Sequence, residues 1–352
     1  LVLFLEIFYS LPLWMPSLLE NTSTVNMNNS HFLEPFKPTN VSITILILVA
    51  FLMGTTVNGL FLWMLGLRMK KTVNTFWFHH LILTNLISCL ILPFFAVYVL
   101  HDFHWILGTV VCKIIKSLFS MVMFTTVFLL TTISLDRYFF ICYPVWSRQY
   151  RTIPRAKRLV TGLWLSSITL SIPSLVLLET QEVQNKMQCD YTFAFSKDAS
   201  FHLAFFLVQF LLAFLLPFLT MLICYCWIGF ELKRKHLVKT GKPFRILVTA
   251  VASFFISWLP YHFYNAFHSF RIASERTNQI LWDIAAAGGC FNICFTPIVY
   301  LFVGEKFHQV FKMPVISLFS KYFEDYPRIP GENTNTGQEL DHSHGETTRM
   351  QS

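Results

Sequence analysis

The sequence predicts an all-α membrane protein, a seven-transmembrane helix bundle followed by a short amphipathic eighth helix. Two observations predict this fold. Hydrophobic residues make up 54% of the 352 residues and charged residues 13%, which is more apolar side chain than one soluble core could bury. Seven apolar runs are also long enough to cross a hydrocarbon layer of ~30 Å. In chain order they lie near residues 43–67, 76–100, 109–141, 156–178, 201–230, 243–268 and 280–303.

Basic residues alternate between the two sides of the predicted bundle. They follow the first, third and fifth runs, for example at Arg68, Arg151 and Arg234, and are sparse in the other connections. The positive-inside rule makes the basic connections cytoplasmic, so we expect an extracellular N-terminus and a cytoplasmic C-terminus. The net charge of +8 then reflects topology and contact with membrane lipids, and we expect no nucleic-acid partner.

Residues 1–40 precede the first run and are expected to be an extracellular segment. Its first 19 residues are apolar but lack a basic n-region. Two alternatives remain open for residues 1–26: a degenerate signal peptide, or upstream sequence outside the native protein, with Met27 as an alternative start. Three sequons predict glycosylation before the first run. They begin at Asn21, Asn28 and Asn40.

The rest of the chain divides into three parts. Residues 41–303 hold the seven-helix domain. Residues 304–320 carry apolar side chains at helical spacing, which predicts an amphipathic helix lying in the membrane interface. Residues 321–352 are polar and are expected to form a disordered cytoplasmic tail.

Of the eight cysteines, only Cys112 and Cys189 fall at the predicted outer surface, where the compartment is oxidising. We therefore predict a disulfide between them. It would tie the second outer connection to the start of the third helix.

Each run contains a distinctive polar, aromatic or proline residue. Prolines inside the runs remove a backbone hydrogen bond and kink the helix, which bundles in membranes tolerate. In chain order the residues are Asn58, Asn85, Asp136-Arg137-Tyr138, Trp164, Pro217 with Tyr225, Trp258 with Pro260, and Pro297 with Tyr300.

This series resembles the pattern of rhodopsin-like (class A) G-protein-coupled receptors over about residues 41 to 320. Within that class, Trp105-Ile-Leu-Gly108, Pro144-Val-Trp-Ser and Leu-Ala-Phe-Leu-Leu-Pro217 resemble the chemoattractant group of formyl-peptide, chemerin and prostaglandin D2 type-two receptors. The resemblance implies a plasma-membrane receptor that couples an extracellular peptide or lipid ligand to a heterotrimeric G-protein. The short basic third inner connection implies an inhibitory-type Gα, and arrestin is a second implied partner. We expect no enzymatic activity, cofactor or metal.

The inner end of the third run is the expected coupling site. Asp136 could neutralise the Arg137 guanidinium at rest, and a freed guanidinium could donate to the carbonyls of an inserted partner helix. The alternative is a helix end anchored at the lipid headgroups. The resemblance favours coupling, and Val145 resembles the apolar residue that docks on the G-protein. The expected coupling residues are Asp136, Arg137, Tyr138, Val145, Tyr225, Pro297 and Tyr300.

The outer half of the bundle is the expected ligand site. Phe119 stands where amine receptors of the class carry aspartate, so an amine ligand is not expected. Lys113 and Lys116 suit a ligand carboxylate, although lysines can also reach the headgroups. Gln209 stands where this group commonly has arginine or lysine, which weakens anion recognition. The expected ligand-binding residues are Phe95, Tyr98, Lys113, Lys116, Phe119, Ser120, Gln209, Trp258, Tyr261, His262 and Asn265.

Two departures from the class keep an alternative function open. Asn85 replaces the aspartate that resembles the sodium site of the class, and Thr296 replaces the asparagine or aspartate before Pro297. A neutral amide lacks the carboxylate that a hard cation prefers. The alternative is a receptor that binds or scavenges ligand without signalling. A transporter or channel would need an internal repeat or a polar midplane path, and the sequence shows neither.

Overall fold

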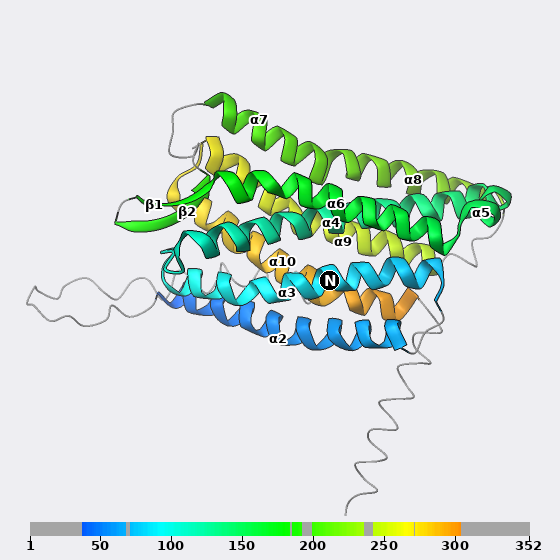
Figure 1. Cartoon of the computed structure of the whole chain (residues 1–352), viewed down its shortest axis with the longest axis horizontal. Coiled ribbons are helices and arrows are strands. Elements are labelled where there is room, and N and C mark those ends of the chain that lie inside the picture. Colours follow the sequence, from blue (N-terminus) through cyan, green and yellow to red (C-terminus); the bar gives the residue numbers. More distant parts are fainter. Residues whose placement is uncertain are drawn as a thin grey trace, which may run out of the picture.

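The computed structural model describes residues 37–67, 71–183, 185–191, 199–235, 242–270 and 272–303. Over these ranges the long helices lie side by side in a bundle (Figure 1). They are α2 (Pro38–Leu67), α3 (Val73–Leu100), α4 (Gly108–Cys142), α6 (Ile153–Leu177), α7 (Ala199–Phe210) continuing through the π-helical turn η2 (Leu211–Leu215) into α8 (Leu216–Arg234), α9 (Lys242–Phe270) and α10 (Glu275–Val303).

Six helical segments of the described ranges are long and apolar enough to cross a membrane, and α9 completes the bundle as its seventh long segment. The predicted seven-helix fold is therefore confirmed. Helix ends differ from the apolar runs, and caps set some of them. α3, for example, begins after Thr72, whose Oγ1 accepts from the Thr75 N–H at 3.2 Å while Thr75 Oγ1 accepts from the Thr72 N–H at 2.8 Å.

Two glycines allow helices to approach closely. A Cβ on Gly54 of α2 would lie 2.8 Å from Cys89 Sγ of α3, and one on Gly288 of α10 would lie 2.5 Å from the carbonyl oxygen of Ser257 on α9. Both positions need a residue without a side chain. The largest buried cluster forms around α3 and α4 and includes Leu81, Ile82, Val127, Leu129 and Ile133.

A two-stranded hairpin and a short helix close opposite ends of the bundle (Figure 1). β1 (Leu178–Val183) pairs antiparallel with β2 (Lys186–Tyr191), and Thr180 faces Cys189. α5 (Pro144–Tyr150) has proline in its first turn, where the missing N–H costs nothing. We call the two ends the disulfide end and the Arg137 end. Neither the hairpin nor α5 is predicted by the apolar runs.

The predicted disulfide is present: Cys112, in the first turns of α4, is bonded to Cys189 on β2, with the Cα atoms 5.9 Å apart. The other predictions for the two termini lie outside the described residues. These are the segment before residue 37 with Asn21 and Asn28, the eighth helix over 304–320, and the tail over 321–352. They stay predictions.

Candidate functional sites at the two ends of the bundle

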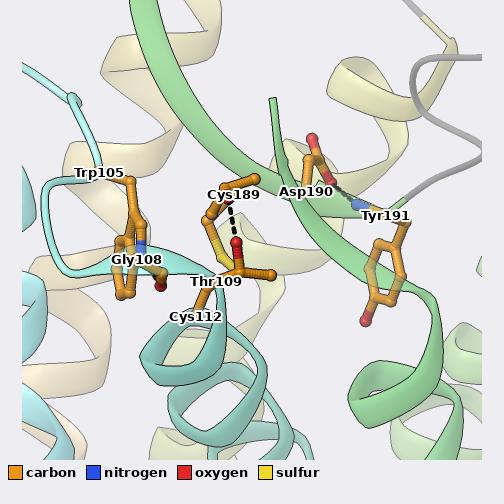
Figure 2. The surroundings of a disulfide bond; sticks show 8 residues. Trp105, Gly108, Thr109, Cys112, Cys189, Asp190 and Tyr191 are labelled. Atoms are coloured by element: carbon orange, nitrogen blue, oxygen red, sulfur yellow. Dashed lines mark hydrogen bonds between the residues drawn. A yellow bond between two sulfur atoms is a disulfide. The ribbon is translucent and has the colours of Figure 1, made fainter. Parts of the chain in front are cut away.

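The hairpin is fixed over the start of α4. Besides the disulfide, Thr109 and Thr180 hydroxyls lie 2.5 Å apart, and the Trp105 indole N–H donates to the Gly108 carbonyl at 2.9 Å (Figure 2). Leu178 and Trp105 are buried in the same cluster as the two cysteines. The hairpin therefore forms a lid whose position is set by α4.

An aromatic layer lies within the helices below the lid. The Phe119 ring on α4 contacts Phe95 of α3 at 5.7 Å between centroids, Trp258 of α9 at 5.7 Å and Tyr261 of α9 at 5.4 Å. Tilted and edge-on ring contacts of this kind add to the stability given by burial. The structure thus brings together predicted ligand-binding residues from three helices. The side chains hydrogen-bonded to Tyr261 are Gln209 and Asn265.

Three predicted ligand-binding residues lie elsewhere. Tyr98 contacts Phe103 and Trp105 nearer the lid. Ser120 is buried within α4. His262 is 4% exposed, and its imidazole packs against Phe210 and Phe214 on the α7 side. A histidine inside a membrane span suggested a functional contact for His262, but its surroundings favour a packing role.

Lys116 is a cation close to the aromatic layer. It is half-buried on α4, three residues before Phe119, and its Nζ has no carboxylate within 4.0 Å among the described side chains. The carboxylate of Asp190 on β2 interacts electrostatically with Lys116 and with Tyr261. The prediction missed Asp190, although its place next to Cys189 was a usable signal. Lys113, one turn earlier, is also half-buried.

A second acidic residue, Asp102, joins three segments at the disulfide end. Its carboxylate accepts from Lys37 Nζ at 2.9 Å, from Asn40 Nδ2 at 3.0 Å and from Lys186 Nζ at 2.5 Å. These donors come from the start of α2 and from β2. Asp102 itself follows α3 and has a left-handed φ of 53°, which aspartate tolerates better than most residues. We call this group the Asp102 latch.

Asn40 requires a correction. It was predicted to carry a glycan, but it lies in the first turn of α2, is 2% exposed and donates to Asp102. A glycan needs open space around the amide nitrogen, and the Asn40 side chain is enclosed in the folded bundle. The sequon pattern carries no information about burial, and Asn40 is buried in the bundle.

The Asp102 latch is expected to hold between pH 7.5 and pH 5. Burial alone would raise the pKa of Asp102, but hydrogen bonds from Lys186, Lys37 and Asn40 outweigh it and lower the pKa to about 2. Because the pKa of Asp102 in the folded protein lies below its ordinary value of 3.8, the stabilisation is present above that pH and is lost as the pH falls towards about 2. Amide hydrogen exchange of the hairpin, corrected for intrinsic rates, should show equal protection at both pH values. Asp102→Asn should reduce protection at both, and a loss at pH 5 in the unmodified protein would contradict the assignment.

The middle of the bundle does not fit the sodium ion that the resemblance implies. A small cavity there is lined by uncharged side chains, among them Thr126, Asn292 and Thr296. Asn85 is 3% exposed, and its Nδ2 has no hydrogen-bond partner in the part of the chain that the structure describes. A donor amide and hydroxyls do not supply the carboxylate oxygen that a hard cation prefers. We therefore assign sodium no role.

At the Arg137 end, the expected pairing of Asp136 with Arg137 is wrong. The Asp136 carboxylate instead accepts two bonds from Arg151, from Nε at 2.8 Å and from Nη2 at 3.0 Å. Arg137 Nη2 donates to Asn74 Oδ1 at 2.5 Å, and Arg151 also donates to that oxygen. The prediction missed Asn74 and treated Arg151 only as a topology signal, because residues 15 positions apart carry no local pattern.

The other predicted coupling residues surround this network. The Tyr225 and Ser134 hydroxyls are 2.9 Å apart, joining α8 to α4. Val145 on α5 is 83% exposed, which leaves it available to a partner. The Tyr138 ring contacts Tyr143. Pro297 lies inside α10, and the side chain of Tyr300 is outside the described part of the structure.

Comparison with known proteins finds a matching family model and several similar proteins. The model of the 7 transmembrane receptor (rhodopsin family) matches residues 57–300. The chain is 40% identical over 332 residues to probable G-protein coupled receptor 33 of Homo sapiens, covering 90% of this chain and 97% of that protein. It is 39% identical over 322 residues to the Mus musculus protein of the same name, covering 87% and 94%. Identity to chemerin-like receptor 1 of Mus musculus is 34% over 322 residues, covering 87% and 84%.

Proposed function

The chain belongs to the rhodopsin family of seven-transmembrane receptors, and on that premise we propose that it couples an extracellular peptide or acidic lipid to an inhibitory-type Gα. As a member of the family it is a multi-pass cell-surface G-protein-coupled receptor and not an enzyme. We further propose that the disulfide end is extracellular, because the basic connections gather at the Arg137 end. Arrestin would be a second partner there.

The observation that carries the ligand class is Lys116. A half-buried ammonium without a carboxylate within 4.0 Å, among the described side chains, is costly unless a ligand supplies the anion. The adjacent layer of Phe95, Phe119, Trp258 and Tyr261 offers apolar and aromatic surface to the rest of such a ligand. A carboxylate attached to an apolar body matches both. Peptides with a free C-terminus and acidic lipids have that chemistry.

The proposal of an inhibitory-type Gα rests on the basic residues at the end of α8. Lys233, Arg234 and Lys235 form a short basic segment, in which Arg234 and Lys235 pair with Glu231 at 2.7 and 3.0 Å. These pairs can stabilise the last turn of α8, at the Arg137 end of the bundle. By family resemblance a short basic extension favours the inhibitory type.

Lys116→Gln should weaken the response to carboxylate ligands selectively. Probes are peptides with a free C-terminus beside their C-terminal amides, and fatty acids beside their methyl esters, screened by nucleotide exchange on a panel of Gα proteins. For any acid that activates, losing one charge-assisted bond of about 1.5–3 kcal/mol should raise the half-maximal concentration about tenfold or more. The amide or ester should be weak on the unmodified receptor and unaffected by the change.

The control is Lys71→Gln, an exposed lysine at the Arg137 end. It removes the same charge without touching the aromatic layer, so the response should not change. Lys113→Gln tests the other candidate lysine on α4. If Lys116→Gln responds to every acid as the unmodified receptor does, the carboxylate assignment is wrong.

A second candidate function is a receptor that internalises ligand without productive coupling. The neutral Asn85 and Thr296 favour it, because they remove residues that the class uses between ligand and G-protein. Uptake of a labelled active acid, with no exchange on any Gα of the panel, would support this alternative. Exchange on an inhibitory Gα would exclude it.

A further inference from the structure

Asp136 is adjacent to Arg137 in the chain, yet its carboxylate is occupied by Arg151. The two bonds from Arg151 are bidentate, and the side chains are only 20% and 10% exposed. Bidentate guanidinium–carboxylate pairs are the strong form of the ion pair, and partial burial reduces screening by salt. Asp136 therefore contributes little directed bonding to Arg137.

Arg137 and Arg151 compete for the same acceptors. Both donate to Asn74 Oδ1, and both act electrostatically on one another and with Asp136. Two guanidinium groups beside one carboxylate leave a local excess of one positive charge. If Arg151 were neutral, the carboxylate would be free to turn to Arg137, its neighbour in sequence.

Arg151 is placed by α5. It follows the last residue of that helix, and its backbone N–H donates to the Ser147 carbonyl at 2.9 Å. Its guanidinium also lies 5.4 Å from the centre of the Phe140 ring on α4. Val145, on the same short helix, is 83% exposed. The position of the competing guanidinium therefore depends on how α5 sits against α4.

We propose that Arg151 is a positioning residue that keeps Asp136 away from Arg137 and so raises ligand-independent nucleotide exchange. In the receptor, the Asp136 carboxylate alternates between two partners, Arg151 and Arg137. Only the first leaves the Arg137 guanidinium held by a neutral amide, from which a partner can withdraw it. The basal activity is set by the difference in free energy between the two pairings.

Ligand-independent exchange in membranes containing the full chain tests this, measured at matched surface expression on a panel of Gα proteins. Arg151→Gln should lower the basal rate about three- to tenfold, the range expected from the coupling of charges in one network. Arg151→Lys, which keeps the charge but not the bidentate geometry, should lie in between. The matched control is Arg158→Gln, an exposed arginine on α6, which should leave the rate unchanged.

The decisive comparison uses Asp136→Asn. Without the carboxylate there is nothing for the two arginines to share, so adding Arg151→Gln to Asp136→Asn should cause no further fall. A fall of the same size in that background would show that Arg151 acts directly on the G-protein, and an unchanged or raised rate in Arg151→Gln alone would equally overturn the proposal. If Arg151→Gln fails to reach the surface, the Arg151→Lys comparison in both backgrounds gives the same decision.

Discussion

Replacing Cys112 or Cys189 by serine should remove most of the receptor from the cell surface and abolish ligand binding by what remains. The bond closes a separation of 77 residues, and loss of a native disulfide typically costs about 2–5 kcal/mol. It also releases the hairpin, whose inner residues Leu178 and Cys189 are buried with Trp105. The ratio of surface to total receptor, measured with an N-terminal epitope in intact and permeabilised cells, reports the loss.

The control is Cys226→Ser, because that thiol is free and exposed on α8. It should express and bind as the unmodified receptor does. Normal surface level and binding in Cys112→Ser would show that the lid is held without the bond. The hydrogen bonds of Thr109 and Trp105 would then have to be sufficient.

Arg137→Ala should abolish nucleotide exchange while leaving ligand affinity unchanged. Arg137 lies 18 residues beyond Phe119 on one continuous helix, roughly 27 Å at 1.5 Å per residue, so the change is remote from the aromatic layer. A charge-assisted hydrogen bond is worth about 1.5–3 kcal/mol, which alone predicts at least a tenfold fall in exchange. Binding of an active acid and exchange on the Gα panel are measured on the same membranes.

Arg137→Lys separates charge from geometry. A lysine keeps the positive charge but loses the planar fork, so partial exchange is expected. Full exchange in Arg137→Ala would move the coupling surface elsewhere, for example to Val145 on α5. Loss of ligand binding in Arg137→Ala would instead show that the substitution disturbs the fold.

The sequence predicts the bundle well because membrane burial acts on whole segments. Apolar runs of more than 20 residues leave few alternatives to a membrane-spanning helix. Cys112 and Cys189 differ from the other cysteines because they fall on the oxidising side of the membrane. The hairpin is harder to predict, since Leu178–Val183 and Lys186–Tyr191 are short and mostly polar, and it depends on the disulfide for its position. α5 is too short for a periodic pattern to appear.

Some residues of the candidate sites could likewise be predicted from the sequence, and others could not. Phe119 of α4 could be predicted to meet Trp258 and Tyr261 of α9, because each residue sits at a recognisable place on its helix. The partner of Asp136 could not, because chain adjacency favours Arg137 while the fold delivers Arg151 from beyond α5. Asn40 and His262 show the same limit. A sequon or a histidine identifies a chemical group, but its availability depends on neighbours that are distant in sequence.

If α9 tilts, the contact between Gly288 and Ser257 is the expected fulcrum. A Cβ at Gly288 would lie 2.5 Å from the Ser257 carbonyl oxygen, so the backbones of α9 and α10 come very close at this position. From that point to Lys242 the helix forms a lever arm of 15 residues, roughly 22 Å at 1.5 Å per residue. A tilt of about 10° about the fulcrum would carry the Lys242 end through about 4 Å. Trp258 follows Ser257 directly in the chain, so we expect a displacement of its ring to act next to this contact and the resulting movement to be larger at the Lys242 end.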